Sequence, residues 1–101
     1  MSGVPIPYRF QYVHVPANET EYPLGAEGQV GDYLHRVVVT LTTNNSANIT
    51  IGDGEFEHLL VPSGVSRGVY NLELNMVSQD GGFSITTSSE AEVLAVGIFT
   101  N

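Results

Sequence analysis

The sequence predicts an all-β protein, an antiparallel two-sheet sandwich of jelly-roll-like form with seven or eight strands. Val, Ile and Thr fill 26 of the 101 positions, and five Tyr and four Phe add to the preference for strands. Turn signals made of Gly, Pro, Asn-Asn and Asp-Gly recur about every 8–12 residues, the strand spacing of sandwiches and barrels. No stretch of about 12 residues has the apolar period of an amphipathic helix.

Seven segments have the composition or apolar alternation of strands, and turns or loops separate them. They are residues 8–15, 32–43, 48–51, 55–61, 69–77, 83–87 and 92–99, with a polar connection over residues 17–31. In the segment 32–43, Val37, Val39 and Leu41 face one way, with Leu34, Val38 and Thr40 opposite. Apolar residues on both faces predict that this strand is central in its sheet.

The chain is long enough for one domain, and residues 8–101 are predicted to form it. Residues 1–7 are predicted to be an extended N-terminal arm, because Pro5 and Pro7 lack backbone donors and favour an extended backbone. Such an arm is suited to lie along a neighbouring subunit. There is no cysteine, so the thin core of a domain this small has no disulfide support.

The charge balance disfavours two classes of partner. The chain has eleven acidic residues, no lysine and three arginines (Arg9, Arg36 and Arg67), giving a net charge of −8. Binding to nucleic acid or to an anionic membrane depends on basic side chains, so neither is expected. No signal-peptide pattern and no apolar run of about 20 residues is present, and synthesis in a cytoplasm without export is predicted.

No catalytic, cofactor or metal site is predicted. His14, His35 and His58 do not form the His-x-His pattern of a cupin metal site. Ser66 fits the pattern Gly-x-Ser-x-Gly, but a strand follows it instead of the helix that a nucleophile elbow requires. Glu55 and Glu57 share one face of a strand and are interpreted as solvated, although Ca²⁺ bridging through the nearby Asp-Gly turns stays open.

The three arginines are the scarce donors of an acidic chain, able to form paired hydrogen bonds with carboxylates. Arg36 lies in the middle of a strand and is expected to pair within the chain. Arg67 lies in the loop 62–68 and Arg9 in a first strand bracketed by prolines. Arg9, Arg67, Pro5 and Pro7 are therefore the predicted protein-contact residues.

Several stretches together resemble small proteins of tailed bacteriophages, encoded among virion genes. They are residues 31–39 (GDYLHRVVV), 52–54 (GDG), 68–70 (GVY), Leu72 with Leu74, 83–87 (FSITT) and 93–99 (VLAVGIF). Some of those proteins resemble capsid decoration, or cement, proteins, which are β-sandwich subunits that bind the outside of the head shell.

The resemblance implies a non-enzymatic virion protein on the capsid surface, made in the host bacterial cytoplasm. Its implied partners are the major capsid protein and copies of itself, most simply as a trimer. Three alternatives stay open. The first is another virion component, such as a head fibre base, an adaptor or a tail protein; the second is a carbohydrate-binding β-sandwich module; the third is an enzyme whose site the sequence does not reveal. The absence of Trp counts against the second, because sugar sites usually use exposed aromatic side chains.

Overall fold

The computed structural model describes residues 10–26 and 30–99, and within them it has eight strands and no helix. The strands are β1 (Gln11–Val15), β2 (Tyr22–Pro23), β3 (Tyr33–Leu41), β4 (Ile49–Asp53), β5 (Phe56–Val61), β6 (Gly68–Val77), β7 (Phe83–Thr86) and β8 (Ala91–Ile98). They form two antiparallel sheets, in the order β1-β8-β3-β6 (sheet A) and β2-β7-β4-β5 (sheet B). The prediction of an all-β protein with two antiparallel sheets is confirmed.

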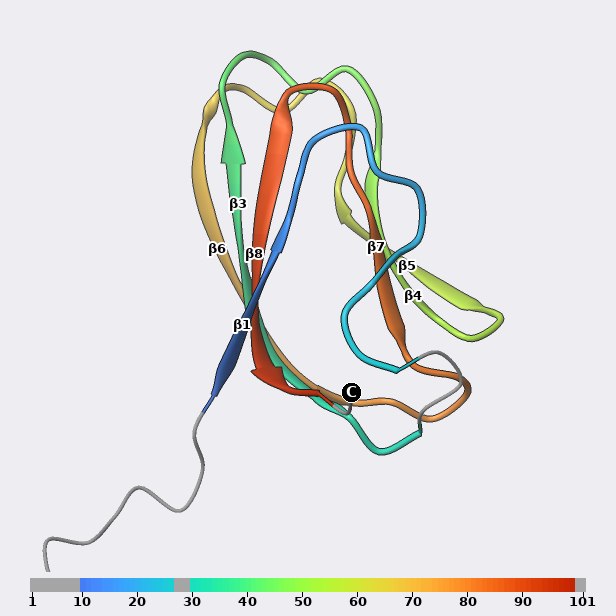
Figure 1. The fold of residues 1–101 in the computed structure, drawn as a ribbon. Coiled ribbons are helices and arrows are strands. Elements are labelled where there is room, and N and C mark those ends of the chain that lie inside the picture. Colours follow the sequence, from blue (N-terminus) through green and yellow to red (C-terminus); the bar gives the residue numbers. More distant parts are fainter. Residues whose placement is uncertain (1–9, 27–29, 100–101) are drawn as a thin grey trace, which may run out of the picture.

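The two sheets face each other across a shared core (Figure 1). In sheet A, β1 pairs with β8, so the first and last described strands lie side by side. β3 lies between β6 and β8 and is central, as predicted. Among residues 10–26 and 30–99, none forms a helix able to cross a membrane.

The core is built from side chains that alternate along strands of both sheets. Val37, Val39 and Leu41 form the inner face of β3, as predicted. The other members with almost no exposed surface include Val15, Ile49, Ile51, Ile85 and Val93. Since full burial of such a side chain stabilises a fold by about 1.5–3 kcal/mol, these residues determine which face of each strand points inward.

The predicted orientation of Leu34 is wrong. Leu34 was expected on the face opposite Val37, but both side chains are fully buried in the core. The register of β3 shifts between Leu34 and Arg36 against both neighbouring strands. An extra residue at such a bulge reverses the alternation of side chains, so Leu34 and Val37 point the same way.

The predicted strands agree with the observed ones to within one or two residues at each boundary, apart from residues 8 and 9, which lie outside the described residues. The exception is β2, a two-residue strand inside the connection 17–31 that the sequence predicted to be a loop. β2 pairs with β7 through Tyr22 and Pro23. A strand of two residues is too short to show an alternation of apolar and polar residues, so the sequence could not predict it.

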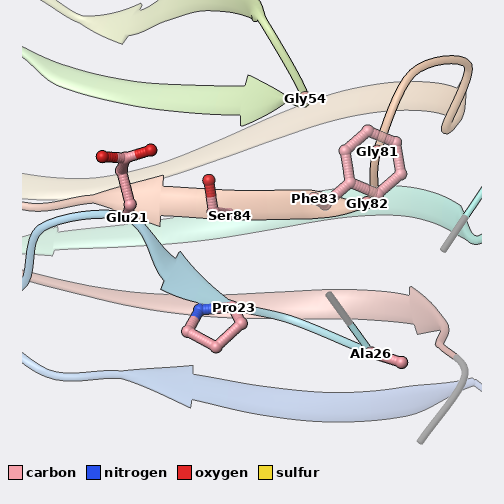
Figure 2. A pocket seen from close by; sticks show the side chains of 8 residues that line it. All are labelled: Glu21, Pro23, Ala26, Gly54, Gly81, Gly82, Phe83 and Ser84. Carbon is pink, nitrogen blue, oxygen red and sulfur yellow. The ribbon is translucent and has the colours of Figure 1, made fainter. Parts of the chain in front are cut away.

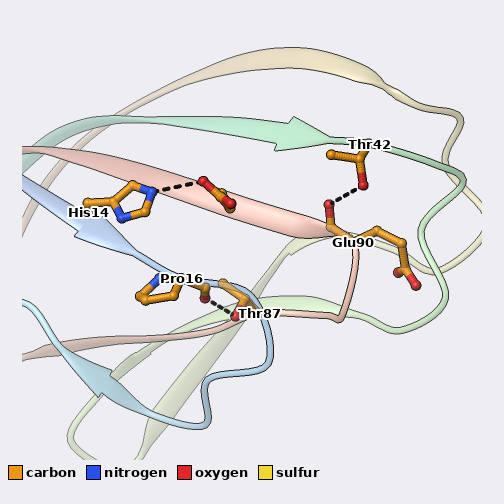
Figure 3. Close-up of polar contacts among 6 residues, drawn as sticks. His14, Pro16, Thr42, Thr87 and Glu90 are labelled. Atoms are coloured by element: carbon orange, nitrogen blue, oxygen red, sulfur yellow. Dashed lines mark hydrogen bonds and ion pairs between the residues drawn. The ribbon is translucent and has the colours of Figure 1, made fainter.

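Side-chain hydrogen bonds hold the loops at one end of the sheets. The hydroxyl of Thr87 donates to the Pro16 carbonyl at 2.7 Å, and that of Thr42 donates to the Glu90 carbonyl at 3.3 Å (Figure 3). The buried Ser88 hydroxyl donates to the side-chain oxygen of Asn45 at 2.6 Å. These contacts connect the segments after β1, β3 and β7, which the sequence places far apart.

Candidate protein-contact face

The outer face of sheet A, the side turned away from the core, differs from an ordinary solvated sheet face. Its residues lie in cross-strand rows that the register defines. One row is Tyr12, Val96, Arg36 and Glu73; the next is His14, Leu94, Val38 and Asn71. At one end lie Ile98, Tyr33 and Val77, and at the other Glu92, Thr40 and Val69. Apolar residues therefore occupy positions at which an exposed antiparallel sheet normally alternates to polar ones.

Large apolar side chains are exposed on this face. Within the described residues, the exposed large apolar side chains are Phe10, Tyr12, Val30, Phe56, Leu59, Val69 and Val77. Tyr12 and Val69 are the most exposed of them, at 69% and 68%, and both belong to the outer face of sheet A. Val77 lies there by register, and Phe10 by alternation with Tyr12. Exposed apolar side chains gathered on one face indicate a surface that a partner covers.

An aromatic cluster lies at the β1 end of this face. The ring centroids of Phe10 and His35 are 4.9 Å apart, and those of Tyr33 and His35 are 6.2 Å apart. The Tyr33 hydroxyl donates to the side-chain oxygen of Asn75 at 2.6 Å. His35 Nδ1 is buried without a hydrogen-bond partner. The bulge in β3 thus places a polar nitrogen under an aromatic surface, and aromatic rings supply much of the contact area at protein interfaces.

Arg36 lies in the middle of the face, with Val96 and Glu73 as its cross-strand neighbours. The expectation that Arg36 pairs within the chain is wrong for the described residues, because no carboxylate oxygen there lies within 4.0 Å of its guanidinium. Its Nε is buried and has no hydrogen-bond partner. An unsatisfied donor of this kind costs about 1–3 kcal/mol, so a partner that supplied an acceptor would relieve that cost.

The one ion pair between described residues is on the same face. His14 Nε2 and Glu92 Oε1 are 3.0 Å apart, on the neighbouring strands β1 and β8 (Figure 3). Both side chains are 59% exposed. A pair this exposed contributes about 0–1 kcal/mol to stability in water. We therefore regard these two side chains as a polar border of the apolar surface and not as a main source of stability.

The structure describes only one of the four predicted contact residues, Arg67. Pro5, Pro7 and Arg9 lie outside the described residues, although Arg9 directly precedes Phe10 of the outer face. Arg67 is exposed in the loop between β5 and β6 and forms no ion pair with a described residue. Sequence analysis missed Tyr12, Val69 and Val77, because alternation alone does not tell which of two apolar faces is the core.

A second surface feature is a shallow hollow on the outer face of sheet B (Figure 2). It has a volume of about 360 Å³ and continues into a neighbouring hollow of about 270 Å³, with Glu21, Gly54 and Ser84 shared. Glu57 and Thr86 also border it. Its lining is therefore rich in hydroxyl and carboxylate oxygens.

Residues 10–26 and 30–99 contain no group of three His, Asp or Glu side chains placed to hold a metal ion. Asp53 and Asp80, the aspartates of the two Asp-Gly turns, accept backbone hydrogen bonds instead. Asp80 Oδ2 accepts from the Glu55 amide at 2.7 Å, and Asp53 accepts from Gln79 at 2.7 Å. Ser66 lies in a loop between two strands, as predicted, and its carbonyl accepts a hydrogen bond from the Tyr70 hydroxyl.

Fold and surface together define an all-β, two-sheet protein with an apolar outer sheet face. The sequence matches no known protein family, and no curated protein or solved structure is significantly similar to it.

Proposed function

We propose that this chain is a structural protein of a tailed-bacteriophage virion, a capsid decoration or cement protein that binds the outside of the head shell. The proposal includes a jelly-roll topology for the domain. The strand orders β1-β8-β3-β6 and β2-β7-β4-β5 support it, since two four-stranded sheets with these crossing connections are the arrangement of two Greek keys. The resemblance of residues 31–99 to small phage proteins supports the biological role.

The observation that carries the proposal is the apolar outer face of sheet A. A decoration protein acts by surface contact alone, and sheet A has core-forming residues on one face and exposed aromatic and aliphatic residues on the other. Tyr12, Tyr33 and Arg36 are of the residue types that are enriched at the energetic centres of protein interfaces. In a chain of net charge −8, this face also holds one of only three arginines.

The partners proposed are the major capsid protein and further copies of this chain, with a trimer as the favoured oligomer. Contacts with neighbours would stabilise a domain that lacks disulfides, by binding the folded state only. Protein made in the host bacterial cytoplasm would then reach the capsid surface during assembly. Arg67 and the arm of residues 1–7 are proposed as additional contacts.

Particle binding tests this proposal. The chain should be found by mass spectrometry in purified virions of the phage that encodes it, and the recombinant protein should rebind particles that lack it. Tyr12→Asp and Leu94→Asp should each reduce rebinding about tenfold or more, the effect of losing a central apolar contact. Leu59→Asp is the control, because Leu59 is an exposed aliphatic residue of sheet B, at 56% against 69% for Tyr12. Absence from virions, or equal rebinding by all three variants, would contradict the proposal.

A different position on the particle would point to a head fibre base, an adaptor or a tail component instead. Electron microscopy of gold-labelled protein on virions distinguishes these positions. Label on the head shell supports the decoration role, whereas label confined to the neck or tail supports the alternatives.

The hollow on sheet B favours a second candidate, a carbohydrate-binding module. Glu21, Glu57 and Ser84 place carboxylate and hydroxyl oxygens around a depression large enough for a sugar unit. Retention on a glycan array, lost in Glu21→Gln together with Ser84→Ala, would favour this role. Binding that Tyr12→Asp abolished instead would assign the contact to sheet A.

A further inference from the structure

The sandwich is open along the side at which β5 and β6 end their sheets, here called the β5–β6 side. These two strands are joined by residues 62–67 alone, so they border the same side of the core. The core-facing residues of β6 are only partly buried: Tyr70, Leu72, Leu74 and Met76. A complete sandwich would enclose side chains of this kind.

The facing part of β5 is also uncovered. Phe56 is the cross-strand partner of Asp53, and His58 is the partner of Ile51. Asp53 and Ile51 are buried on the inner face of sheet B, and directly paired residues share a face. Phe56 and His58 are nevertheless exposed, Phe56 at 60%. Apolar surface that belongs to the core by register is therefore left open on this side.

β6 also has a free backbone edge. It is the longest strand, with ten residues, and among the described residues it pairs only with β3. Alternate N–H and C=O groups of an edge strand point outward and can accept another strand. No proline or lysine protects this edge, although a shift of register near Asn75 interrupts it. The regular part, from Gly68 to Glu73, is long enough to pair with a segment of about five residues.

Residues 3–7 (Gly-Val-Pro-Ile-Pro) have the pattern of such a segment. Val4 and Ile6 alternate with Pro5 and Pro7. In an extended chain, the side chains of Val4 and Ile6 lie on one face, and their N–H and C=O groups point to one edge. The prolines then face the opposite edge, where no donor is needed, which is how proline is tolerated in an edge strand.

The charges fit as well. The first 18 residues contain no acidic side chain, in a chain that has eleven. Glu73 of β6 and Glu57 of β5 belong to the two strands that border the open side, and by register their side chains lie on the outer faces of the two sheets. A segment without carboxylates, followed by Arg9, can approach that side without repulsion.

The segment cannot reach this edge within its own subunit. β1 and β6 are the two ends of sheet A, so a strand added beside β6 would lie four strand spacings from β1, about 19 Å away. Ile6 is four residues from Phe10, and four extended residues span at most about 14 Å. The occupant must therefore come from another copy of the chain.

We infer that residues 3–7 of one copy add as a strand to the β6 edge of a neighbouring copy, with Val4 and Ile6 covering Leu72 and Leu74. The inference rests on the proposed function in assuming that copies assemble on one particle. It goes further by naming the segment and the edge that join them. The exchanged strand completes the core of the neighbour, so association and folding stability are coupled.

Cross-linking between copies tests the inference on the full chain, which has no cysteine of its own. Gly3→Cys is introduced into a tagged copy, and Val69→Cys, Asn71→Cys or Asn75→Cys into an untagged one. A disulfide needs Cα atoms within about 7 Å. At least one mixture should give about fivefold more mixed disulfide than a control with Thr43→Cys, because docking raises the local thiol concentration. Thr43 is exposed in the loop after β3, beyond the last residue of β3 that pairs with β6. Yields equal to the control at all three positions would overturn the inference.

A second variant tests the role of the apolar side chains. Val4→Asp combined with Ile6→Asp in the tagged copy should reduce the mixed disulfide about fivefold or more, since two carboxylates would face the apolar side chains of β6. Ser2→Asp, which adds one charge outside residues 3–7, should reduce the yield less than the double variant does. If the double variant cross-links as well as its parent, the segment does not insert Val4 and Ile6, and the inference is wrong. Particle rebinding is measured separately, so that cross-linking without rebinding would reject only the proposed function.

Discussion

The buried hydroxyl of Ser78 donates a 2.6 Å hydrogen bond to Oδ1 of Asp53, which joins the end of β4 to the turn that follows β6. The same carboxylate accepts from the backbone amides of Gln79, Asp80 and Gly81. One side chain thus fixes the path of the chain from sheet A into sheet B. A carboxylate that accepts several amide hydrogen bonds stabilises a turn more strongly than a neutral acceptor does.

Asp53→Asn is expected to destabilise the domain by about 2 kcal/mol, because the amide replaces one acceptor oxygen with a donor that faces backbone N–H groups. The free energy of unfolding from urea titration measures this effect. Asp80→Asn is the control. Asp80 is exposed and accepts a backbone hydrogen bond from Glu55, so the loss of its carboxylate should cost less than about 1 kcal/mol. Equal effects of the two variants would contradict the special role of Asp53.

The acid stability of the domain should depend on the same carboxylate. Burial raises the pKa of Asp53, but the hydrogen bonds from Gln79, Ser78, Gly81 and Asp80 outweigh it, and the net pKa lies below the usual 3.8. Because the folded state holds the proton more weakly than the unfolded state, this contribution is complete well above pH 3.8. It is lost as the pH falls through the lowered pKa. Asp53→Asn should therefore flatten the loss of stability below about pH 4, measured by urea titration at several pH values.

Glu90 offers a separate test of the loop network. Hydrogen bonds from the Ser89 hydroxyl and from the amide and hydroxyl of Ser46 lower the pKa of its carboxyl from 4.5 to about 2. Titration followed by the side-chain carboxyl ¹³C shift should give a midpoint near that value. Ser46→Ala should raise the midpoint. Thr42→Ala should move it less, because the Thr42 hydroxyl donates to the Glu90 backbone carbonyl and not to the carboxylate. A midpoint that Ser46→Ala leaves unchanged would show that the network is not formed.

Gly97 in β8 should not tolerate a side chain. A Cβ atom there would lie 2.1 Å from the Tyr33 carbonyl oxygen and 3.0 Å from the Leu34 Cα, both rigid backbone atoms beside the bulge of β3. Gly97→Ala is expected to destabilise the domain by about 3 kcal/mol, since the strands must separate to admit the methyl group. Gly64→Ala is the control, with open space around the added methyl group and a positive φ of 93°, and it should cost about 1 kcal/mol. Thermal unfolding of both variants ranks the two effects.

The strands were predictable from the sequence, because seven of the eight contain apolar alternation bounded by turn residues. The orientation of the Leu34 side chain was not predictable, because no residue type in the sequence indicates the shift of register at His35. The contact face on sheet A could not be predicted from the sequence for a different reason. Leu94 and Val96 alternate with Val93 and Ala95 along β8, and all four are apolar. Only packing against sheet B decides that Val93 and Ala95 face the core. Sequence analysis could therefore predict a strand with two apolar faces, but not which face a partner covers.

A substitution of Arg36 should weaken the association with a partner without destabilising the isolated subunit. In Arg36→Met, the aliphatic part of the side chain that lies near Val96 is kept, while the buried and unpartnered Nε is removed. The stability of the isolated chain should stay within about 0.5 kcal/mol or rise, because an unsatisfied buried donor disappears. Particle rebinding should nevertheless weaken about tenfold, since the partner loses a donor able to form two parallel hydrogen bonds.

Glu73→Gln is the matched control for Arg36→Met. Glu73 is the cross-strand neighbour of Arg36, and it makes no ion pair with a described residue. Its replacement should change neither stability nor rebinding by more than a surface charge does, about 0–1 kcal/mol. If Arg36→Met destabilises the isolated chain and leaves rebinding intact, Arg36 stabilises the fold. The contact on the outer face of sheet A would then depend on Tyr12 and its apolar neighbours alone.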